Sequence, residues 1–149
     1  MGWKLDKSHK PNHNSYALYY HVVFVTQRRE PTIDQEIAAF LMQFFQDKCD
    51  EMSIHLLEAN VLCDHVHLIL SLRPTHYIPE VLNILKGTSA HEANHHHNFQ
   101  QTLHWMRGYH VETISPRLLM QVKDYVRRQY QHHPDKIPLP PGQDQGAPP

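Results

Sequence analysis

The sequence is poor in the residues that mark several large classes of protein. It has two cysteines, Cys49 and Cys63, in 149 residues, too few for a disulfide framework and in no zinc-finger spacing. No apolar run approaches the roughly 18 residues of a membrane-spanning helix. Its 14 Lys and Arg are balanced by 15 Asp and Glu, unlike the strongly basic composition of a bulk nucleic-acid binder. We therefore expect a cytoplasmic protein that makes no membrane contact, with any nucleic-acid contact confined to a local surface.

Length and composition predict one domain with two different ends. Hydrophobic residues make up 40% of the sequence, which is enough for one core. A chain of 149 residues is long enough for one compact domain and too short to hold two comfortably. Residues 1–15 are polar and predict a loose arm. Residues 134–149, "PDKIPLPPGQDQGAPP", are rich in proline and glycine, a composition that predicts a disordered tail. The working domain is predicted to span 16–133.

Hydrophobic periodicity predicts seven elements in that domain. Strands are expected at 16–26, 55–64, 65–72 and 105–114, and helices at 33–51, 78–96 and 115–133. Asp34 and Ser115 are candidate helix caps, and Pro79 falls in a first turn, where proline is tolerated. The order β-α-β-β-α-β predicts an α+β fold of the ferredoxin-like split βαβ type, with one antiparallel sheet packed on two helices. The third, C-terminal helix is additional, and we expect it to cover the open face of the sheet.

Two histidines lie one residue apart in the stretch "CDHVHLIL", residues 63–70. Side chains two apart in a strand share a face, so His65 and His67 point the same way and Val66 and Leu68 point into the core. Two imidazoles at this spacing can both reach one divalent metal ion, with oxygen ligands or water completing the shell. The chain has 15 histidines, however, so a chance His-x-His pair is the competing explanation.

The last predicted helix contains "YVRRQ", residues 125–129. Tyr125 and Gln129 are four apart and share a helix face, beside an apolar stripe of Leu118, Val122 and Val126. A glutamine carbonyl can complete a metal shell, and a tyrosine hydroxyl can act as a nucleophile. The alternative is a half-buried core tyrosine next to an exposed glutamine. Tyr130, one position past Gln129, is the rival candidate for the nucleophile, and it points to a different side of the helix from Tyr125.

Five ordered segments resemble one family, the single-tyrosine HUH transposases of small bacterial and archaeal insertion sequences and their repetitive-palindrome-associated relatives. The segments are "YHVVFVTQRREPTI", "DHVHLIL", "ILKGTSAHE", "LHWMRGYHVETI" and "VKDYVRRQYQHH". They resemble, in order, the first strand with its basic turn, the His-hydrophobic-His strand, the Lys-Gly-Ser segment, the tryptophan strand and the nucleophile helix. The resemblance covers nearly all of 16–133. The arm at 1–15 and the proline-rich tail have no counterpart that we can place.

This resemblance implies a transposase that cuts and rejoins single-stranded DNA at the ends of an insertion sequence. It implies that Tyr125 is the nucleophile that forms a 5′-phosphotyrosine, and that His65, His67 and Gln129 bind Mg²⁺ or Mn²⁺. It also implies a homodimer, often with the tyrosine helix of one subunit serving the other, and DNA hairpins beside the cut site. The basic residues that the resemblance suggests as DNA contacts, with solvated surface charge as the alternative, are Arg28, Arg29, Lys86, Arg107, Arg127 and Arg128.

Two other classes of function remain open from the sequence. A His-x-His phosphoesterase or nucleotide hydrolase with a histidine nucleophile would favour a third aligned histidine or a nearby set of acidic ligands. Position 69 is Ile, however, and Asp64 is expected to face away from His65. A non-catalytic module that binds hairpin DNA or RNA on the same fold would need aromatic platforms on the open face of the sheet. Tyr16, Tyr20 and Phe24 share one face of the first strand and could form such a platform.

Overall fold

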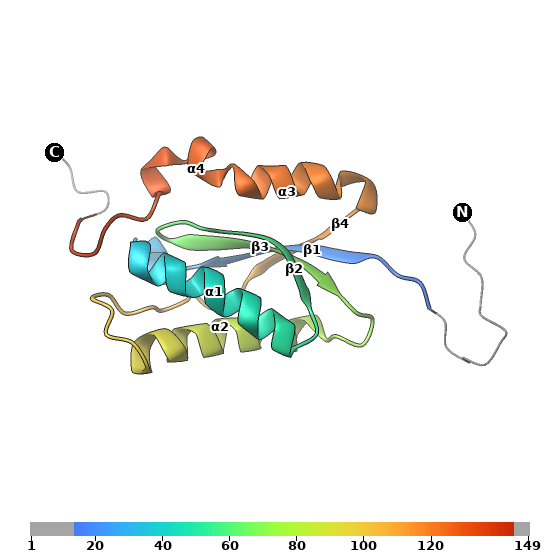
Figure 1. The fold of residues 1–149 in the computed structure, drawn as a ribbon, viewed down its shortest axis with the longest axis horizontal. Helices are drawn as coiled ribbons and strands as arrows, with labels where there is room; N and C mark the ends of the chain where they lie inside the picture. Colours follow the sequence, from blue (N-terminus) through green and yellow to red (C-terminus); the bar gives the residue numbers. More distant parts are fainter. Residues whose placement is uncertain (1–13, 145–149) are drawn as a thin grey trace.

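The computed structural model describes residues 14–144, which form a three-layered domain (Figure 1). A four-stranded antiparallel sheet in the order β2-β3-β1-β4 forms the middle layer. Its strands are β1 (Leu18–Val25), β2 (His55–Val61), β3 (His65–Leu72) and β4 (His110–Ile114). Helices α1 (Gln35–Glu51) and α2 (Ile78–His95) cover one face. The predicted ferredoxin-like α+β architecture is confirmed, whereas residues 1–13 of the predicted arm lie outside the described residues.

The main core lies between the sheet and α1 and α2. Val66, Leu68 and Leu70 of β3 are fully buried there and pack with Phe24 of β1, because alternate residues of a strand share a face. Helix α1 begins where the sequence predicts, since the Asp34 carboxylate accepts a hydrogen bond from the Ile37 backbone N–H at 2.9 Å. This core leaves the odd-numbered positions of β3, including both histidines of interest, on the opposite face of the sheet.

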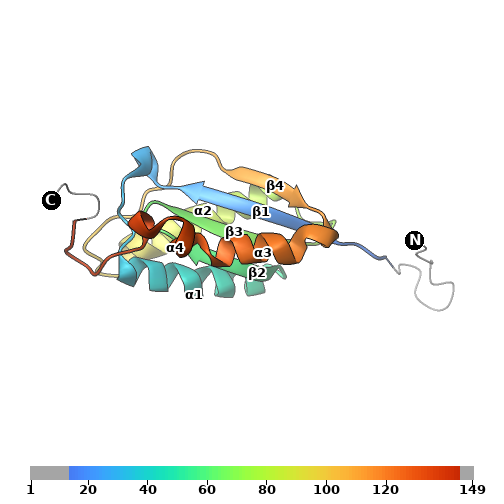
Figure 2. The same cartoon turned by 90° about the horizontal axis from the view of Figure 1, so that it is seen from above.

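The opposite face is covered by the C-terminal helical region, as predicted (Figures 1 and 2). Val126 of α3 (Leu119–Arg127) is fully buried against Ile69 and Ile114 of the sheet. The apolar stripe differs from the predicted one at one position, because Leu119 packs into this second cluster while Leu118 is 51% exposed. The helix therefore lies across the face that displays the histidine pair.

The predicted single helix at 115–133 is wrong, because the region is divided into three pieces. A 3-10 turn at Pro116–Leu118 precedes α3, and Ser115 makes no side-chain cap hydrogen bond. The chain leaves α-helical geometry at Arg128, with φ −94° and ψ 16°, before the short helix α4 (Gln129–His132). Pro116 holds the first turn tight, and the break at Arg128 ends α3 just past the nucleophile candidate.

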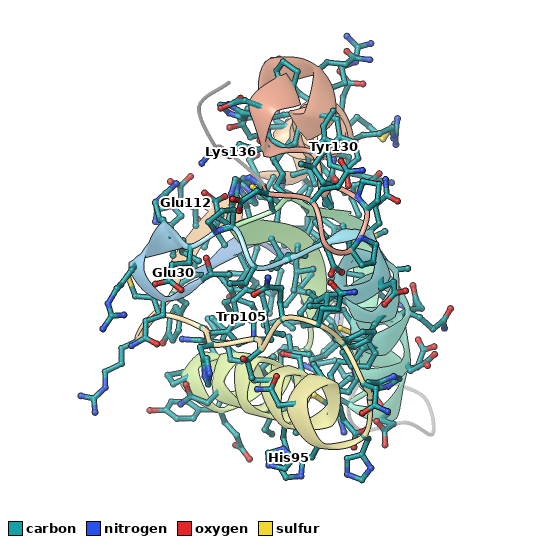
Figure 3. The ribbon with its side chains drawn as sticks, turned by 90° about the vertical axis from the view of Figure 1, so that its left-hand side faces the viewer. Glu30, His95, Trp105, Glu112, Tyr130 and Lys136 are labelled. Carbon is teal, nitrogen blue, oxygen red and sulfur yellow. The ribbon has the colours of Figure 1, made fainter. Side chains whose placement is uncertain are left out.

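The fourth strand is shorter than predicted, because the chain joins the sheet only from His110. Trp105 forms an isolated bridge with Thr26, and Gly108 turns with a positive φ of 82° between the bridge and β4. The Trp105 indole N–H donates to the Ser89 hydroxyl of α2 at 3.0 Å, between the sheet and α2 in Figure 3. This indole hydrogen bond ties the loop to α2, in addition to the bridge that joins it to the end of β1.

The proline-rich segment after α4 differs from the predicted disordered tail as far as residue 144. The 3-10 turn Pro134–Lys136 returns the chain to the domain, where the Lys136 carbonyl accepts from the Cys63 N–H at 2.8 Å. The Leu139 carbonyl accepts from the Gln35 N–H at 2.8 Å, and Pro138 is buried. Composition misled here because proline lacks a donor but can still pack and fix the backbone. Residues 145–149 lie outside the described residues.

Between residues 14 and 144 no helix combines the length and the apolar character that crossing a membrane requires.

Candidate metal and nucleophile site

His65 and His67 point to the same face of β3, as predicted, and their rings meet edge to edge. The two Nε2 atoms lie 3.1 Å apart, with the ring planes at 72°. Both residues are nearly buried, at 9% and 6% exposure, beneath α3. Burial and the neighbouring His65 and His21 lower the pKa of His67 to about 3. This ring is therefore neutral near pH 7, with a proton on one nitrogen and a free lone pair on the other.

Asp64 fixes the orientation of His65. The side chain of Asp64 is fully buried, and its Oδ1 lies 2.7 Å from Nδ1 of His65 while its Oδ2 lies 2.6 Å from Nζ of Lys136. Burial opposes ionisation of Asp64, but the hydrogen bonds from His65 and Lys136 outweigh it and hold its pKa at about 2. The expectation that Asp64 faces away from His65 is wrong, because Asp64 lies in the turn before β3, where strand alternation does not apply.

Asp64 and Lys136 were not found as site residues from the sequence, although the carboxylate is adjacent to the histidine motif. An ionised carboxylate can only accept, so His65 donates its Nδ1–H, and the neutral ring then has its lone pair on Nε2. A carboxylate behind a ligating histidine is the common outer-shell arrangement of metal sites.

His21 of β1 is a further site residue that sequence reasoning missed. Its Nε2 lies 2.9 Å from Nδ1 of His67. It reaches His67 because β1 and β3 are neighbouring antiparallel strands, with Val23 opposite His67 and His21 opposite Ile69. The sequence did contain a signal, since His21 has the opposite parity to the core residue Phe24 and so faces the same side as the histidine pair.

Tyr125 lies beside the histidines, and the rival Tyr130 does not. The Tyr125 ring is edge-on to His67 and to His21, with centroids 6.2 Å apart in each case, and it is 46% exposed. The hydroxyl of Tyr130 instead donates to the Val61 carbonyl at 2.7 Å, and burial raises its pKa. Figure 3 shows Tyr130 in the layer above the sheet. The hydroxyl of Tyr130 is therefore engaged in holding α4 to β2.

Gln129 is buried, at 1% exposure, one turn after Tyr125. Its amide nitrogen donates to the Tyr125 carbonyl at 3.2 Å, while its Oε1 has no hydrogen-bond partner among the described residues. Leaving a buried acceptor unsatisfied costs about 1–3 kcal/mol. The alternative of an exposed glutamine is therefore wrong, and this orphaned oxygen is of the kind that a cation can satisfy.

The spacing of the donors fits a divalent cation in octahedral coordination. Two ligands at right angles in an octahedral shell of about 2.1 Å radius lie about 3.0 Å apart, close to the 3.1 Å between the Nε2 atoms of His65 and His67. Within residues 14–144 no group of three His, Cys, Asp or Glu side chains converges on one point. A third protein ligand would therefore be an amide or a carbonyl oxygen, as the Gln129 side chain offers, with water or substrate oxygen in the remaining positions.

A cavity of about 540 Å³ opens beside the pair, between the sheet and α3. His21, His67 and Tyr125 lie on its wall, together with His110 and Glu112 of the edge strand β4. The last two are paired at 2.8 Å, and both are exposed. Tyr125, His67 and His21 thus face one open space, which an extended substrate could enter from the β4 side.

The six basic residues suggested as DNA contacts fall into two groups. One group flanks Tyr125: Arg127 is paired with Glu58 at 3.0 Å, and Arg128 with Asp124 at 3.2 Å. Such partly exposed pairs are weak and can exchange partners.

The second group comes from α2, from the loop before β4 and from the turn after β1. Lys86 donates to the Met106 and Gly108 carbonyls, and burial lowers its pKa. Arg107 lines the same hollow as Lys86, while Arg28 and Arg29 form an exposed turn with positive φ after β1. Lys86 therefore has a structural role in holding the loop before β4.

The aromatic platform proposed on β1 is wrong. Phe24 is fully buried in the main core, and Tyr20 packs against that core. Both lie on the helix-covered face because Phe24 pairs with Val66 and Tyr20 with Leu70 in the sheet register. Only Tyr16, before the strand, is exposed, which leaves the non-catalytic alternative without its stacking surface.

Comparison with known proteins gives one consistent result. Residues 14–129 match the profile of the family described as "Transposase IS200 like". The chain is 28% identical over 120 residues to the ISDra2 transposase TnpA of Deinococcus radiodurans, and this alignment covers 77% of this chain and 86% of that protein. It is 24% identical over 122 residues to the transposase of insertion sequence element IS200 from Salmonella typhimurium, which covers 78% and 80% of the two chains.

Two solved structures share the fold. A crystal structure of a candidate transposase from Deinococcus radiodurans superposes with a TM-score of 0.60 at 29% identity, covering 81% of this chain and 97% of that one. A REP-associated tyrosine transposase bound to a REP hairpin also gives a TM-score of 0.60, at 14% identity, covering 82% and 73%.

Proposed function

The chain belongs to the IS200-like transposase family, and on that premise we propose that it cleaves and rejoins single-stranded DNA at insertion-sequence ends through a 5′-phosphotyrosine on Tyr125. The observation that carries the proposal is the position of Tyr125, whose exposed ring lies edge-on to His67 at the mouth of the open cavity. A nucleophile must be both accessible to substrate and close to the groups that stabilise charge on the reacting phosphate.

The reaction is an exchange of one phosphodiester for another. The Tyr125 oxygen forms a bond to the scissile phosphorus while the bond from phosphorus to the 3′ oxygen breaks. Tyr125 loses its phenolic proton, and the departing 3′ oxygen gains one. Attack by a second 3′ hydroxyl reverses the step, so strands rejoin without an external energy source. The Tyr130 hydroxyl, held by the Val61 carbonyl, takes no part.

His65, His67 and Gln129 would bind the divalent cation. When bound, such a cation polarises the scissile phosphate and offsets the negative charge that develops in the transition state. The protein supplies the rest of the arrangement: Asp64 holds the orientation of His65, and α3 covers the nearly buried rings of His65 and His67.

The proposed partners are hairpin-bearing single-stranded DNA and a second copy of the chain. The hairpin is supported by analogy with the REP-associated tyrosine transposase, which is bound to one. Arg127 and Arg128 flank Tyr125 and would exchange their present carboxylate partners for phosphate. Because few phosphates are contacted, binding should depend only modestly on salt.

A covalent-adduct assay tests the proposal. The protein is incubated with Mg²⁺ and labelled single-stranded DNA from the ends of its own genomic locus, and adducts are resolved on a denaturing gel. We expect an adduct that disappears in Tyr125→Phe and persists in the matched control Tyr130→Phe. Removing the metal with a chelator, or both ligands in His65→Ala with His67→Ala, should also abolish it. Tight hairpin binding with no adduct from the wild type would refute the catalytic proposal and indicate a binding module.

A further inference from the structure

The contact between His21 and His67 has a geometry that limits where protons can be. The ring planes lie only 18° apart, and the centroids are 5.1 Å apart while the nearest nitrogens are at 2.9 Å. Rings so placed meet edge to edge in nearly one plane, with the line between the nitrogens along their lone-pair directions. This is a directed N–H···N hydrogen bond, in which one ring must donate and the other accept.

The protons of the whole chain of contacts can be assigned by counting donors. Asp64 is an acceptor, so His65 donates from Nδ1, and a neutral His65 then has only a lone pair at Nε2. The 3.1 Å contact between the two Nε2 atoms then needs a proton from His67. A neutral His67 that donates from Nε2 accepts at Nδ1.

His21 must therefore donate to His67 at 2.9 Å. Without a cation the three rings form one directed chain, from His21 through His67 and His65 to the Asp64 carboxylate.

A cation held by both Nε2 atoms requires a different arrangement. His67 must then present its Nε2 lone pair and hold its proton on Nδ1, where it faces His21. Two N–H groups cannot point at each other, so the proton of His21 must move from Nε2 to Nδ1. Each ring loses one proton and gains one, through exchange with water in the cavity that both line, and no proton is released overall.

We propose that His21 is a positioning residue for His67: its Nε2 accepts the Nδ1–H of His67, so that the lone pair on Nε2 of His67 faces the cation. The two rings change tautomer together when the cation binds. The inference rests on the proposed metal function of His65 and His67. His21 would then act on His67 as Asp64 acts on His65, and hydrogen-bond partners behind a ligating histidine are worth about 10–100-fold in metal affinity.

Metal affinity and tautomer state test the proposal independently of DNA cleavage. Binding of Mn²⁺ alone is measured by electron paramagnetic resonance on the full chain. His21→Phe keeps a ring but removes the acceptor, and it should weaken Mn²⁺ binding about 10–100-fold. His21→Gln offers an amide oxygen near the position of Nε2 and should restore most of the affinity. His55→Phe, an exposed strand histidine at the start of β2, is the matched control and should bind as the wild type does.

The tautomers are observed by long-range ¹H–¹⁵N correlation on ¹⁵N-histidine-labelled protein, with Mg²⁺ as a diamagnetic probe. We expect His67 and His21 to change from the Nε2–H to the Nδ1–H form together on addition of Mg²⁺. Equal Mn²⁺ affinity in the wild type and His21→Phe, or a His21 ring that keeps its tautomer, would overturn the role of His21 and leave the proposed cofactor standing. A wild type that binds neither ion would overturn the proposed cofactor and this inference with it.

Discussion

Neutralising Asp64 should destabilise the fold in a way that depends on pH. Its pKa falls from 3.8 to about 2 on folding, and at about 1.4 kcal/mol per pKa unit this corresponds to about 2 kcal/mol of stability. Because the folded-state pKa is the lower one, this stability is fully present above pH 4 and is lost as the pH falls through 2. Asp64→Asn should therefore cost about 2 kcal/mol at pH 7, since one amide oxygen cannot accept from both His65 and Lys136.

The contribution of Lys136, the ion-pair partner of Asp64, can be measured against a matched control variant. Lys136→Met leaves one oxygen of a fully buried carboxylate without its donor and should cost about 1–3 kcal/mol. Lys48→Met is the control: its ammonium lies 3.1 Å from Glu51, but that carboxylate is two-thirds exposed, so the loss should stay below about 1 kcal/mol. Combining Asp64→Asn with Lys136→Met should cost less than the sum of the two single changes, because each removes the same contact.

Urea unfolding, followed by tryptophan fluorescence at several pH values, measures these free energies. The reasoning predicts that the gap between wild type and Asp64→Asn closes as the pH approaches 2. A gap that is absent at pH 7, or that keeps its size at pH 2.5, would refute it. Equal costs for Lys136→Met and the control would show that the C-terminal segment is not held through this pair.

Two further outcomes follow from buried groups elsewhere in the fold. Burial raises the pKa of Cys63 to about 11 and that of Cys49 to about 12. Neither thiol should therefore react with iodoacetamide at pH 7.5 in the folded protein, and both should react in urea. Rapid labelling of the native protein would contradict this. Asn94 exchanges two 2.8 Å hydrogen bonds with the backbone of Leu103, and Asn94→Ala should lower the free energy of unfolding by about 2 kcal/mol in chemical denaturation. The exposed Asn98 provides the control, and comparable losses in the two alanine variants would exclude the proposed role.

The sequence was sufficient where one local rule decided the outcome. Strand alternation placed His65 and His67 on one face, and helix capping placed the start of α1 at Asp34. Both rules depend on neighbours within a few residues, so no knowledge of the rest of the chain was needed.

The remaining site residues depend on contacts between distant segments. His21 meets His67 across 46 positions, and Lys136 meets Asp64 across 72. No periodicity connects such positions, because the sheet register and the path of the C-terminal segment bring them together. Composition was misleading for that segment, since its prolines predict disorder while a few carbonyls and one ammonium tie it to the domain.

The attachment of residues 134–140 has a consequence for how copies of the chain could share a site. The segment follows α4 and is held to the turn before β3 and to the start of α1. The other end of α3 is joined to β4 through the turn Pro116–Leu118. The helix that carries Tyr125 is thus tethered at both ends to the sheet it covers. To exchange this helix with a neighbouring copy, residues 134–140 would first have to detach from the domain. The energy of the Lys136–Asp64 contact would then be part of the barrier to exchange.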